Sequence, residues 1–370
     1  MKRYTSYILL VLAVFLFSNL QTIEAAPYNG ENSSISENTS SVPSIFKSLQ
    51  REDVLNLTIE GNFTEIIDGE GKRKYQPATF TYEDEQGEEV KWDIEVRQRG
   101  KSRRRYCEFP PLKLRFSKED LATSGLSSFH TLKLVTHCQG DAAVANETLL
   151  REYLAYELFN EITDYSYQVQ LVQITYRDNS GSFKKLKRYG FIIENNHEMA
   201  ARIDGKINDV LNVASQDRHS QVEAQTALFQ YMIGNQDWDM KFARNIKYVK
   251  TSTSDDLLVI PYDFDFSGLV NASYAKPNPD FKLMSVRERI YLGNQADVQS
   301  IKSALVAFNA KKEAVMQRVN EFKKLNREAR YDIIDYLDSF YQIANYDDIF
   351  GQPTLEVNDT PMPIDNGKDD

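Results

Sequence analysis

The sequence has few of the residues on which disulfide frameworks and zinc sites depend. Its 370 residues include two cysteines, four histidines and two tryptophans. Cys107 and Cys138 can form at most one disulfide, which excludes a disulfide-framework protein, and the sequence leaves open whether they bond. The histidines lack the His-x-x-x-His spacing typical of zinc enzymes. No Gly-x-Ser-x-Gly nucleophile elbow occurs either.

Positive charge and long apolar runs are also scarce. The chain carries 44 Lys and Arg against 54 Asp and Glu, a net charge of -10. We therefore expect no nucleic-acid partner, because proteins that bind nucleic acid usually present a basic face. Beyond the N-terminal stretch no segment is apolar enough to cross a bilayer, so we expect no integral membrane span in the mature protein.

The N-terminal stretch has the three parts of a secretory signal peptide. Two basic residues precede the apolar run Ile8 to Phe17, and small residues follow at Ala25 and Ala26. This order predicts a signal peptide over residues 1–26, cleaved near Ala25 or Ala26. The apolar run is too short for a typical membrane span. The protein is therefore expected to be secreted, into the periplasm or the extracellular space.

The rest of the chain changes from strand-like to helix-like patterns. A polar leader, residues 27–45, precedes short alternating strands interrupted by one helix at 146–162. We expect these strands to form a first lobe over residues 46–195, and helices to form a second lobe over 196–345, followed by an acidic tail over 346–370. The expected fold class is α+β, with two lobes and a cleft between them.

A basic loop stands out against the acidic composition. "RQRGKSRRR", residues 97–105, holds six cations in nine residues around Gly100. Such a density of guanidinium groups suits oxyanions, including phosphate. A solvated loop without a ligand explains the same pattern, and the sequence does not decide between them.

Acidic residues gather around a predicted hairpin. The runs at 245–249 and 257–262 predict two antiparallel strands, which would bring Asn245 and Asp263 together and place Asp237 beside them. Asp263 and Asp265 would project on one side of an extended chain. Carboxylate and amide oxygens are ligands for Mg²⁺ or Mn²⁺. Alternatively, these acids cap turns and helix ends.

Five short motifs, in order, resemble a known family, the CotH-like kinases, which are secreted or spore-coat relatives of atypical protein kinases. The likeness covers about Val90 to Ala275. The motifs are "RQRGKSRRR", "LLREYLAYELFNE", "YGFIIEN", "NQDWDMKFARN" and "IPYDFDFSG". The literal signatures of ordinary protein kinases, G-x-G-x-x-G and H-R-D, are absent.

The resemblance implies a two-lobed protein-kinase-like fold and a reaction. The γ-phosphoryl group of ATP would pass, with Mg²⁺ or Mn²⁺, to a hydroxyl of a secreted or surface protein. Asp237 would act as the catalytic base or orient the acceptor hydroxyl, and Asn245, Asp263 and Asp265 would bind metal. Asn245 follows Asp237 by eight residues, a longer spacing than in ordinary kinases. The nucleotide would contact Arg97, Arg99, Gly100, Ser102 and Arg103 at its phosphates, and Glu194 with Asn195 at its purine.

A kinase also pairs a phosphate-binding lysine with a helix glutamate. The candidates are Lys113, which we prefer, and Lys133, with Glu152 as the partner. Either lysine is equally well explained as an exposed strand residue. Lys241 is a further candidate for neutralising the transferred phosphoryl group.

Two other functions fit the sequence. The protein could keep a kinase-like shape and act as a surface scaffold or binding protein without turnover. Alternatively, two carboxylates in a secreted protein could form a glycoside hydrolase, whose acids lie about 5 to 9.5 Å apart. The basic loop argues against the hydrolase, because that chemistry does not require it.

Overall fold

The computed structural model of the protein describes residues 42–68, 74–100, 103, 107–181, 184–295 and 297–350. The predicted signal peptide, the leader up to residue 41, Ser102 and residues 351–370 of the predicted tail lie outside the described residues. Among the described helices, none combines the length and apolar character needed to cross a bilayer.

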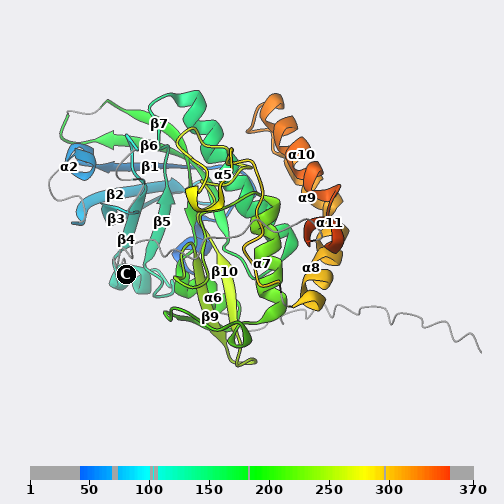
Figure 1. Ribbon diagram of the computed structural model, residues 1–370. Helices are drawn as coiled ribbons and strands as arrows, with labels where there is room; N and C mark the ends of the chain where they lie inside the picture. The colour runs from blue at the N-terminus through cyan, green and yellow to red at the C-terminus, as the bar shows by residue number, and fades with distance from the viewer. Residues whose placement is uncertain are drawn as a thin grey trace, which may run out of the picture. The chain divides into compact units, whose positions relative to one another are not determined.

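Seven strands close into a barrel (Figure 1). They span Leu55–Gly61 (β1), Gln76–Glu83 (β2), Glu89–Gln98 (β3), Leu112–Phe116 (β4), Thr131–Val135 (β5), Val169–Asp178 (β6) and Leu186–Ile193 (β7). The order around the barrel is β1-β2-β3-β4-β5-β7-β6. Neighbours are antiparallel, except that β1 runs parallel to β6 and closes the barrel.

Alternation along the strands builds the barrel core. In β4, Leu112, Leu114 and Phe116 are buried inside the barrel, so Lys113 and Arg115 between them face outward. The same period of two in the sequence predicted these strands, and the structure confirms them. Apolar side chains fill the barrel interior, as expected for a barrel of this size.

The predicted two-lobed protein-kinase-like fold is wrong. The first part of the chain is a closed seven-stranded mixed barrel, with helices around it, rather than the strand-rich lobe of a kinase. The closure rests on the pairing of Leu55 with Val172, continued to Gly61 with Asp178. Alternation identifies a strand but not its partner, so pairing between segments more than 100 residues apart could not be derived from local pattern. The boundary near residue 195 stays a prediction.

Helices surround the barrel and the second sheet. They span Ile45–Leu49 (α1), Phe63–Asp68 (α2), Lys118–Thr123 (α4), Ala142–Ile162 (α5), Asn196–Arg202 (α6), Ser220–Met232 (α7), Val298–Ala310 (α8), Lys312–Glu321 (α9), Arg327–Tyr341 (α10) and Tyr346–Phe350 (α11), with short 3₁₀ helices at Ser215–Asp217 (η1) and Pro279–Phe281 (η2). Of these, α11 begins the predicted acidic tail.

The long helix α5 covers the outer face of β6 and β7 (Figure 1). It begins four residues earlier than the predicted Asn146, because the Asp141 side chain accepts hydrogen bonds from the first free N–H groups, those of Ala143 and Val144. Tyr156 of α5 contacts Phe191 of β7, with ring centroids 5.6 Å apart. The helix is therefore fixed against the barrel and carries Glu152 with it.

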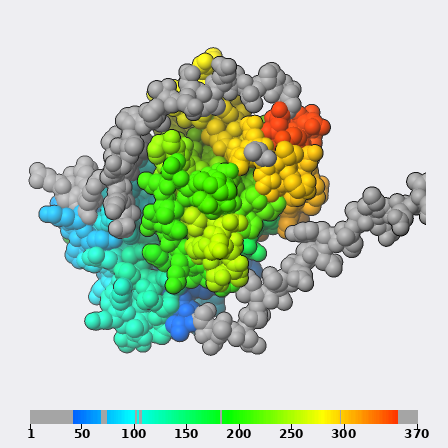
Figure 2. All heavy atoms as spheres, turned by 60° about the horizontal axis from the view of Figure 1, so that its bottom comes forward, coloured from blue at the N-terminus to red at the C-terminus, as the bar shows by residue number. Residues whose placement is uncertain are grey.

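A three-stranded antiparallel sheet follows the barrel in the chain. Its strands are Gly205–Asn208 (β8), Ile246–Thr251 (β9) and Leu257–Pro261 (β10), in the order β10-β9-β8. The predicted hairpin is confirmed as β9 and β10, with Ile246 paired to Pro261. In the space-filling view, the green surface of this region lies between the cyan surface of the barrel strands and the orange C-terminal helices (Figure 2).

Candidate functional site

One buried arginine contacts three carboxylates. The Nη2 atom of Arg103 lies 2.7 Å from Glu152 Oε1 and 3.0 Å from Asp263 Oδ1, and its Nε lies 2.9 Å from Asp265 Oδ2. Glu152 comes from α5, and the two aspartates follow β10. We call Glu152, Asp263 and Asp265 the acidic triad. Its three carboxylates offer ligand atoms within 4.8 Å of one another, and it is the metal-capable group of the described chain.

The acidic triad carries more negative charge than Arg103 neutralises. Burial raises the pKa of Glu152 to about 8, against the effect of Arg103 and with the two aspartates adding to it. Burial also raises the pKa of Asp265, again against Arg103. Burial lowers the pKa of Arg103, but the three carboxylates raise it well above its usual value. Among the described residues Arg103 is the guanidinium that contacts these three acids, of which Glu152 and Asp265 are buried, so the contacts leave a deficit of two positive charges when all three acids are ionised.

Aromatic residues hold the two aspartates in place. The backbone N–H of Asp263 donates to Tyr156 Oη at 2.8 Å, and Tyr274 Oη donates to Asp265 Oδ2 at 3.0 Å. Phe264, between the aspartates, is buried against Tyr156, with centroids 4.6 Å apart. The chain turns here rather than extending, with φ of 66° at Asp263. The expected extended geometry is therefore wrong, although both carboxylates reach one guanidinium.

A tight turn after α7 carries Asp237 to the same end of the hairpin. Gly234 has a φ of 65°, and a Cβ there would lie 2.1 Å from Tyr336 Oη, so glycine suits this helix end. Asn245 Nδ2 donates to Asp237 Oδ2 at 3.0 Å and to its carbonyl oxygen at 2.5 Å. Tyr262 N–H donates to the carbonyl oxygen of Asn245 at 2.9 Å. These contacts fix the Asp237 carboxylate beside the residues that lead into the acidic triad.

Asp237 is about as accessible as Asp263 and more accessible than Glu152 and Asp265. Its side chain is 40% exposed, and Arg244 Nε lies 3.7 Å from its Oδ1. Burial raises the pKa of Asp237 to about 6; Arg244 lowers it, whereas Asp263 and Asp265 raise it. Asp237 therefore belongs electrostatically to the acidic triad while remaining open to an approaching group.

The barrel contributes cations to the same region. Arg97 of β3 is paired with Lys113 of β4, and Lys113 is paired with Lys133 of β5, so three cations follow one another across three strands. We call them the cation row. Burial lowers the pKa of Lys133 well below its usual value; Arg99, Lys247 and Lys113 lower it further, and Asp263 raises it. Lys133, at one end of the cation row, therefore lies within electrostatic reach of Asp263.

In the structure, Glu152 and Lys133, one of its two predicted lysine partners, contact other residues. Glu152 contacts Arg103, whereas Lys133 donates to Asn196 Oδ1 and lies 4.8 Å from the ring centroid of Tyr167. Lys113 occupies the middle of the cation row. Both lysines therefore lie on the outer face of the barrel, and Glu152 of α5 contacts Arg103 of the basic loop.

Three other predicted residues lie apart from the acidic triad. Glu194 accepts hydrogen bonds from Gln168 N–H and Arg202, and its own N–H donates to Gln168. Asn195 caps α6. Lys241 is exposed, with its Nζ 5.5 Å from the centroid of Phe242. Arg99 and Gly100 begin the basic loop, where Arg99 N–H donates to Pro111 at 2.8 Å.

Three residues around the acids were not predicted from the sequence: Tyr156, Tyr274 and Arg244. Tyr156 lies within a helix among apolar residues, and Tyr274 lies nine residues after Asp265 in an irregular segment. Arg244 directly precedes Asn245, so a cation next to a predicted acidic site was the one usable signal. Contacts made by irregular segments follow no residue periodicity, so the sequence pattern does not predict them.

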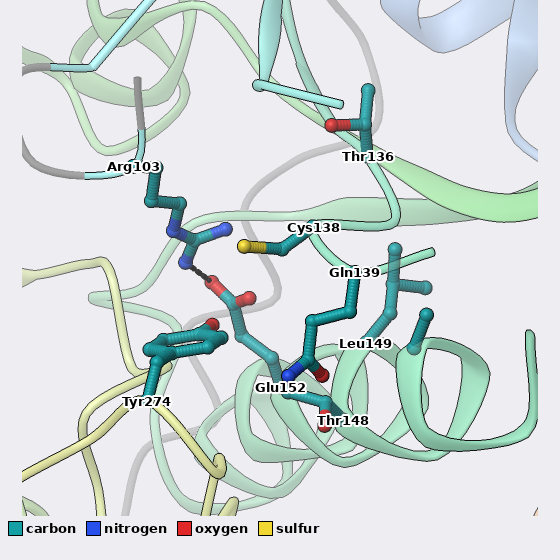
Figure 3. A pocket seen from close by; sticks show the side chains of 9 residues that line it. Arg103, Thr136, Cys138, Gln139, Thr148, Leu149, Glu152 and Tyr274 are labelled. Carbon is teal, nitrogen blue, oxygen red and sulfur yellow. Dashed lines mark hydrogen bonds and ion pairs between the residues drawn. The ribbon is translucent and has the colours of Figure 1, made fainter. Parts of the chain in front are cut away.

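A small pocket opens beside the contact between Arg103 and Glu152. Tyr274 and Cys138 line it together with these two residues, and Figure 3 shows their side chains converging on it. Cys138 is bonded to Cys107. The question that the sequence left open is thereby answered, and the disulfide lies next to the acidic triad.

Comparisons with known proteins give a distant likeness. A Helicobacter pylori proinflammatory kinase, CtkA, is similar over 57% of this chain and 86% of its own, with 11% identity and a TM-score of 0.35. No protein-family model and no curated protein matches the chain, so the resemblance to CotH-like kinases stays a prediction. At this identity and TM-score the likeness supports no argument about this chain, and the chemistry rests on the site alone.

Proposed function

We propose that the protein transfers a phosphoryl group from a nucleoside triphosphate such as ATP to a hydroxyl, with the help of a divalent cation. One observation carries the proposal: an acidic triad that has more carboxylates than cationic contacts among the described residues lies near a row of cations, whose member Lys133 is within electrostatic reach of Asp263. A metal complex of a polyphosphate matches both halves, because its cation suits the acids and its oxygens suit the arginines and lysines.

The acidic triad fits Mg²⁺ or Mn²⁺. All its donors are carboxylate oxygens, which these cations prefer, and two added positive charges would restore its balance. Arg103 contacts one oxygen of each carboxylate, so the second oxygens lie outside that contact. A bound cation of this kind would neutralise charge on phosphate oxygens during transfer.

The phosphates would meet cations from two parts of the chain. Arg103 is fixed by the acidic triad, and the cation row comes from the adjacent strands. Because β3, β4 and β5 are hydrogen-bonded to one another, the spacing of Arg97, Lys113 and Lys133 is set by the barrel. Such a preorganised set of charges stabilises a transferring phosphoryl group without reorganisation.

Asp237 would orient the acceptor hydroxyl. Its carboxylate is accessible, and its Oδ2 is held by Asn245. A raised pKa, about 6, keeps it mostly ionised at neutral pH yet able to accept a proton. We infer that the acceptor is a secreted or surface protein, since the disulfide fits an oxidising compartment.

The test uses the purified protein with Mn²⁺ or Mg²⁺ and ATP labelled at the γ-phosphate. We expect label on the protein itself or on a co-expressed secreted protein, and a loss of about 100-fold or more for Asp263→Asn and for Asp237→Asn. Asp332→Asn, in an ion pair elsewhere, is the matched control and should keep the rate. Binding of ATP and metal without any transfer would identify a binding protein and refute the proposed activity.

A further inference from the structure

We infer that the Cys107–Cys138 disulfide positions Arg103, so that reduction of this bond releases the guanidinium from the acidic triad. Arg103 is buried, with 7% of its surface exposed, although it belongs to a basic loop. A loop arginine needs a structural constraint to stay buried. The Cys107–Cys138 disulfide is the covalent cross-link closest to Arg103 in the chain.

The backbone links the disulfide directly to Arg103. Cys107 N–H donates to the carbonyl oxygen of Arg103 at 2.8 Å. The carbonyl oxygen of Cys138 accepts from Glu108 N–H at 2.9 Å and from Phe109 N–H at 3.4 Å. Residues 107–109 are therefore fastened to Cys138 by one covalent bond and two hydrogen bonds.

Cys138, the second cysteine of the disulfide, lies near Glu152. Cys138 precedes α5, whose N-cap is Asp141, and Cys138 lines the same pocket as Arg103 and Glu152 (Figure 3). The disulfide thus joins Cys107, whose N–H contacts Arg103, to the chain that leads into the helix carrying Glu152. This covalent link limits how far the Arg103 guanidinium can move from the Glu152 carboxylate.

Reduction would remove the covalent part of this tie. The thiolate of a dithiol reductant bonds to one protein sulfur while the other leaves as a thiolate; the reductant's second thiolate then closes a ring and frees the first protein sulfur. Two protein thiols form, their protons come from the reductant and solvent, and the reductant becomes a cyclic disulfide. Without the bond, repulsion within the loop's cations opposes burial of Arg103.

This inference does not require the proposed function, because it concerns only where Arg103 lies. A dicarbonyl reagent such as phenylglyoxal modifies accessible guanidinium groups and therefore reports on Arg103 without substrate. Arg151 is the internal control: it is equally buried, at 6%, and it lies on α5 in a separate ion pair. Arg318, with a side chain 46% exposed, reports the rate of an accessible arginine.

The experiment compares the full chain before and after treatment with dithiothreitol and alkylation, with modification read by peptide mass spectrometry. We expect Arg103 and Arg151 to be protected in the oxidised protein. After reduction, the rate at Arg103 should rise about 10-fold or more while Arg151 stays protected. The double variant Cys107→Ser with Cys138→Ser should behave like the reduced protein without any reductant.

Two results would overturn the inference. If Arg103 stays protected after reduction, the hydrogen bonds to Cys138 and the acidic triad suffice to hold it. If Arg103 and Arg151 become reactive together, the disulfide stabilises the whole fold rather than the position of one side chain. Failure of the phosphotransfer test with a selective rise at Arg103 would leave this inference standing.

Discussion

Arg151 and Glu152, which are neighbours on α5, belong to two ion-pair clusters that differ in their balance of charge. Glu152 lies in the acidic triad, where Arg103 is the one guanidinium in contact with three carboxylates. Arg151 contacts Glu147 and Asp332, and Asp332 also accepts from Arg287. We call this second group the balanced cluster, because two guanidinium groups meet two carboxylates.

The difference in charge balance separates a binding site from a structural tie. In the balanced cluster burial raises the pKa of Asp332, but hydrogen bonds from Arg151 and Arg287 outweigh this and lower it. In the acidic triad burial wins, and the pKa of Glu152 rises to about 8. A cluster that already satisfies its charges stabilises the fold, whereas one that does not has affinity left for a ligand.

The largest expected effect on stability belongs to the balanced cluster. Arg151→Met should lower the free energy of unfolding by about 2 to 3 kcal/mol, because it removes a buried guanidinium from two acids and from the Leu269 carbonyl oxygen. Urea unfolding without added metal measures this change. An unchanged midpoint would show that the cluster contributes no stability, since both acids are partly exposed and screened.

Neutralising an acid should act in opposite directions in the two clusters. At neutral pH Glu152→Gln should stabilise the metal-free protein by about 2 kcal/mol, because the pKa of Glu152, about 8, means that the folded protein must take up a proton there, whereas glutamine is neutral and keeps an oxygen for Arg103. Asp332→Asn should destabilise it. Thermal unfolding in a chelator compares the two variants, and destabilisation by Glu152→Gln would contradict the charge deficit.

Glu198 shows the effect of burying a carboxylate outside either cluster. Burial raises its pKa to about 7, and its Oε2 has no hydrogen-bond partner among the described residues. The folded protein then binds a proton that the unfolded chain releases near pH 4.5, so this contribution to stability is complete below pH 4.5 and is lost as the pH rises through about 7.

Glu198→Gln should remove that pH dependence. Glutamine imitates the protonated acid, so the variant should match the wild type near pH 4.5 and exceed its stability by about 1 to 2 kcal/mol at pH 8. Unfolding midpoints across this range provide the measurement, with Glu328→Gln on the exposed surface as the control. Parallel curves for wild type and variant would show that Glu198 ionises normally.

The smallest effect concerns one hydroxyl group. Tyr274→Phe removes the hydrogen bond to Asp265, which should weaken Mn²⁺ binding about 5-fold, or about 1 kcal/mol. Tyr336→Phe removes a comparable bond to the Arg287 carbonyl oxygen near the balanced cluster and should leave Mn²⁺ binding unchanged. Equal effects of the two variants on Mn²⁺ affinity would contradict the assignment of the acidic triad as the metal site.

The sequence predicted the local elements well. Alternation in β4 and β6 and the polar turn between β9 and β10 are local signals, and the structure has all three elements. The convergence of Asp237 with Asn245 also followed from the chain, because a hairpin brings the start of one strand to the end of the next.

The sequence pattern did not predict the long-range pairing of strands. Nothing in the pattern of β1 indicates that it pairs with β6, so the closed barrel was missed. The partner of Glu152 was expected to be a strand lysine, yet a loop arginine reaches it, held beside Cys107. Contacts made through irregular loops and a disulfide depend on the assembled fold, and residue spacing carries no signal for them.

Binding of Mn²⁺ in the absence of nucleotide separates the two clusters most directly. Calorimetric titration of the wild type should show binding that Asp263→Asn weakens about 100-fold and that Asp332→Asn leaves unchanged. That result would establish the acidic triad as the ligand site and the balanced cluster as structural. Absence of Mn²⁺ binding in the wild type, or equal weakening by both substitutions, would contradict it.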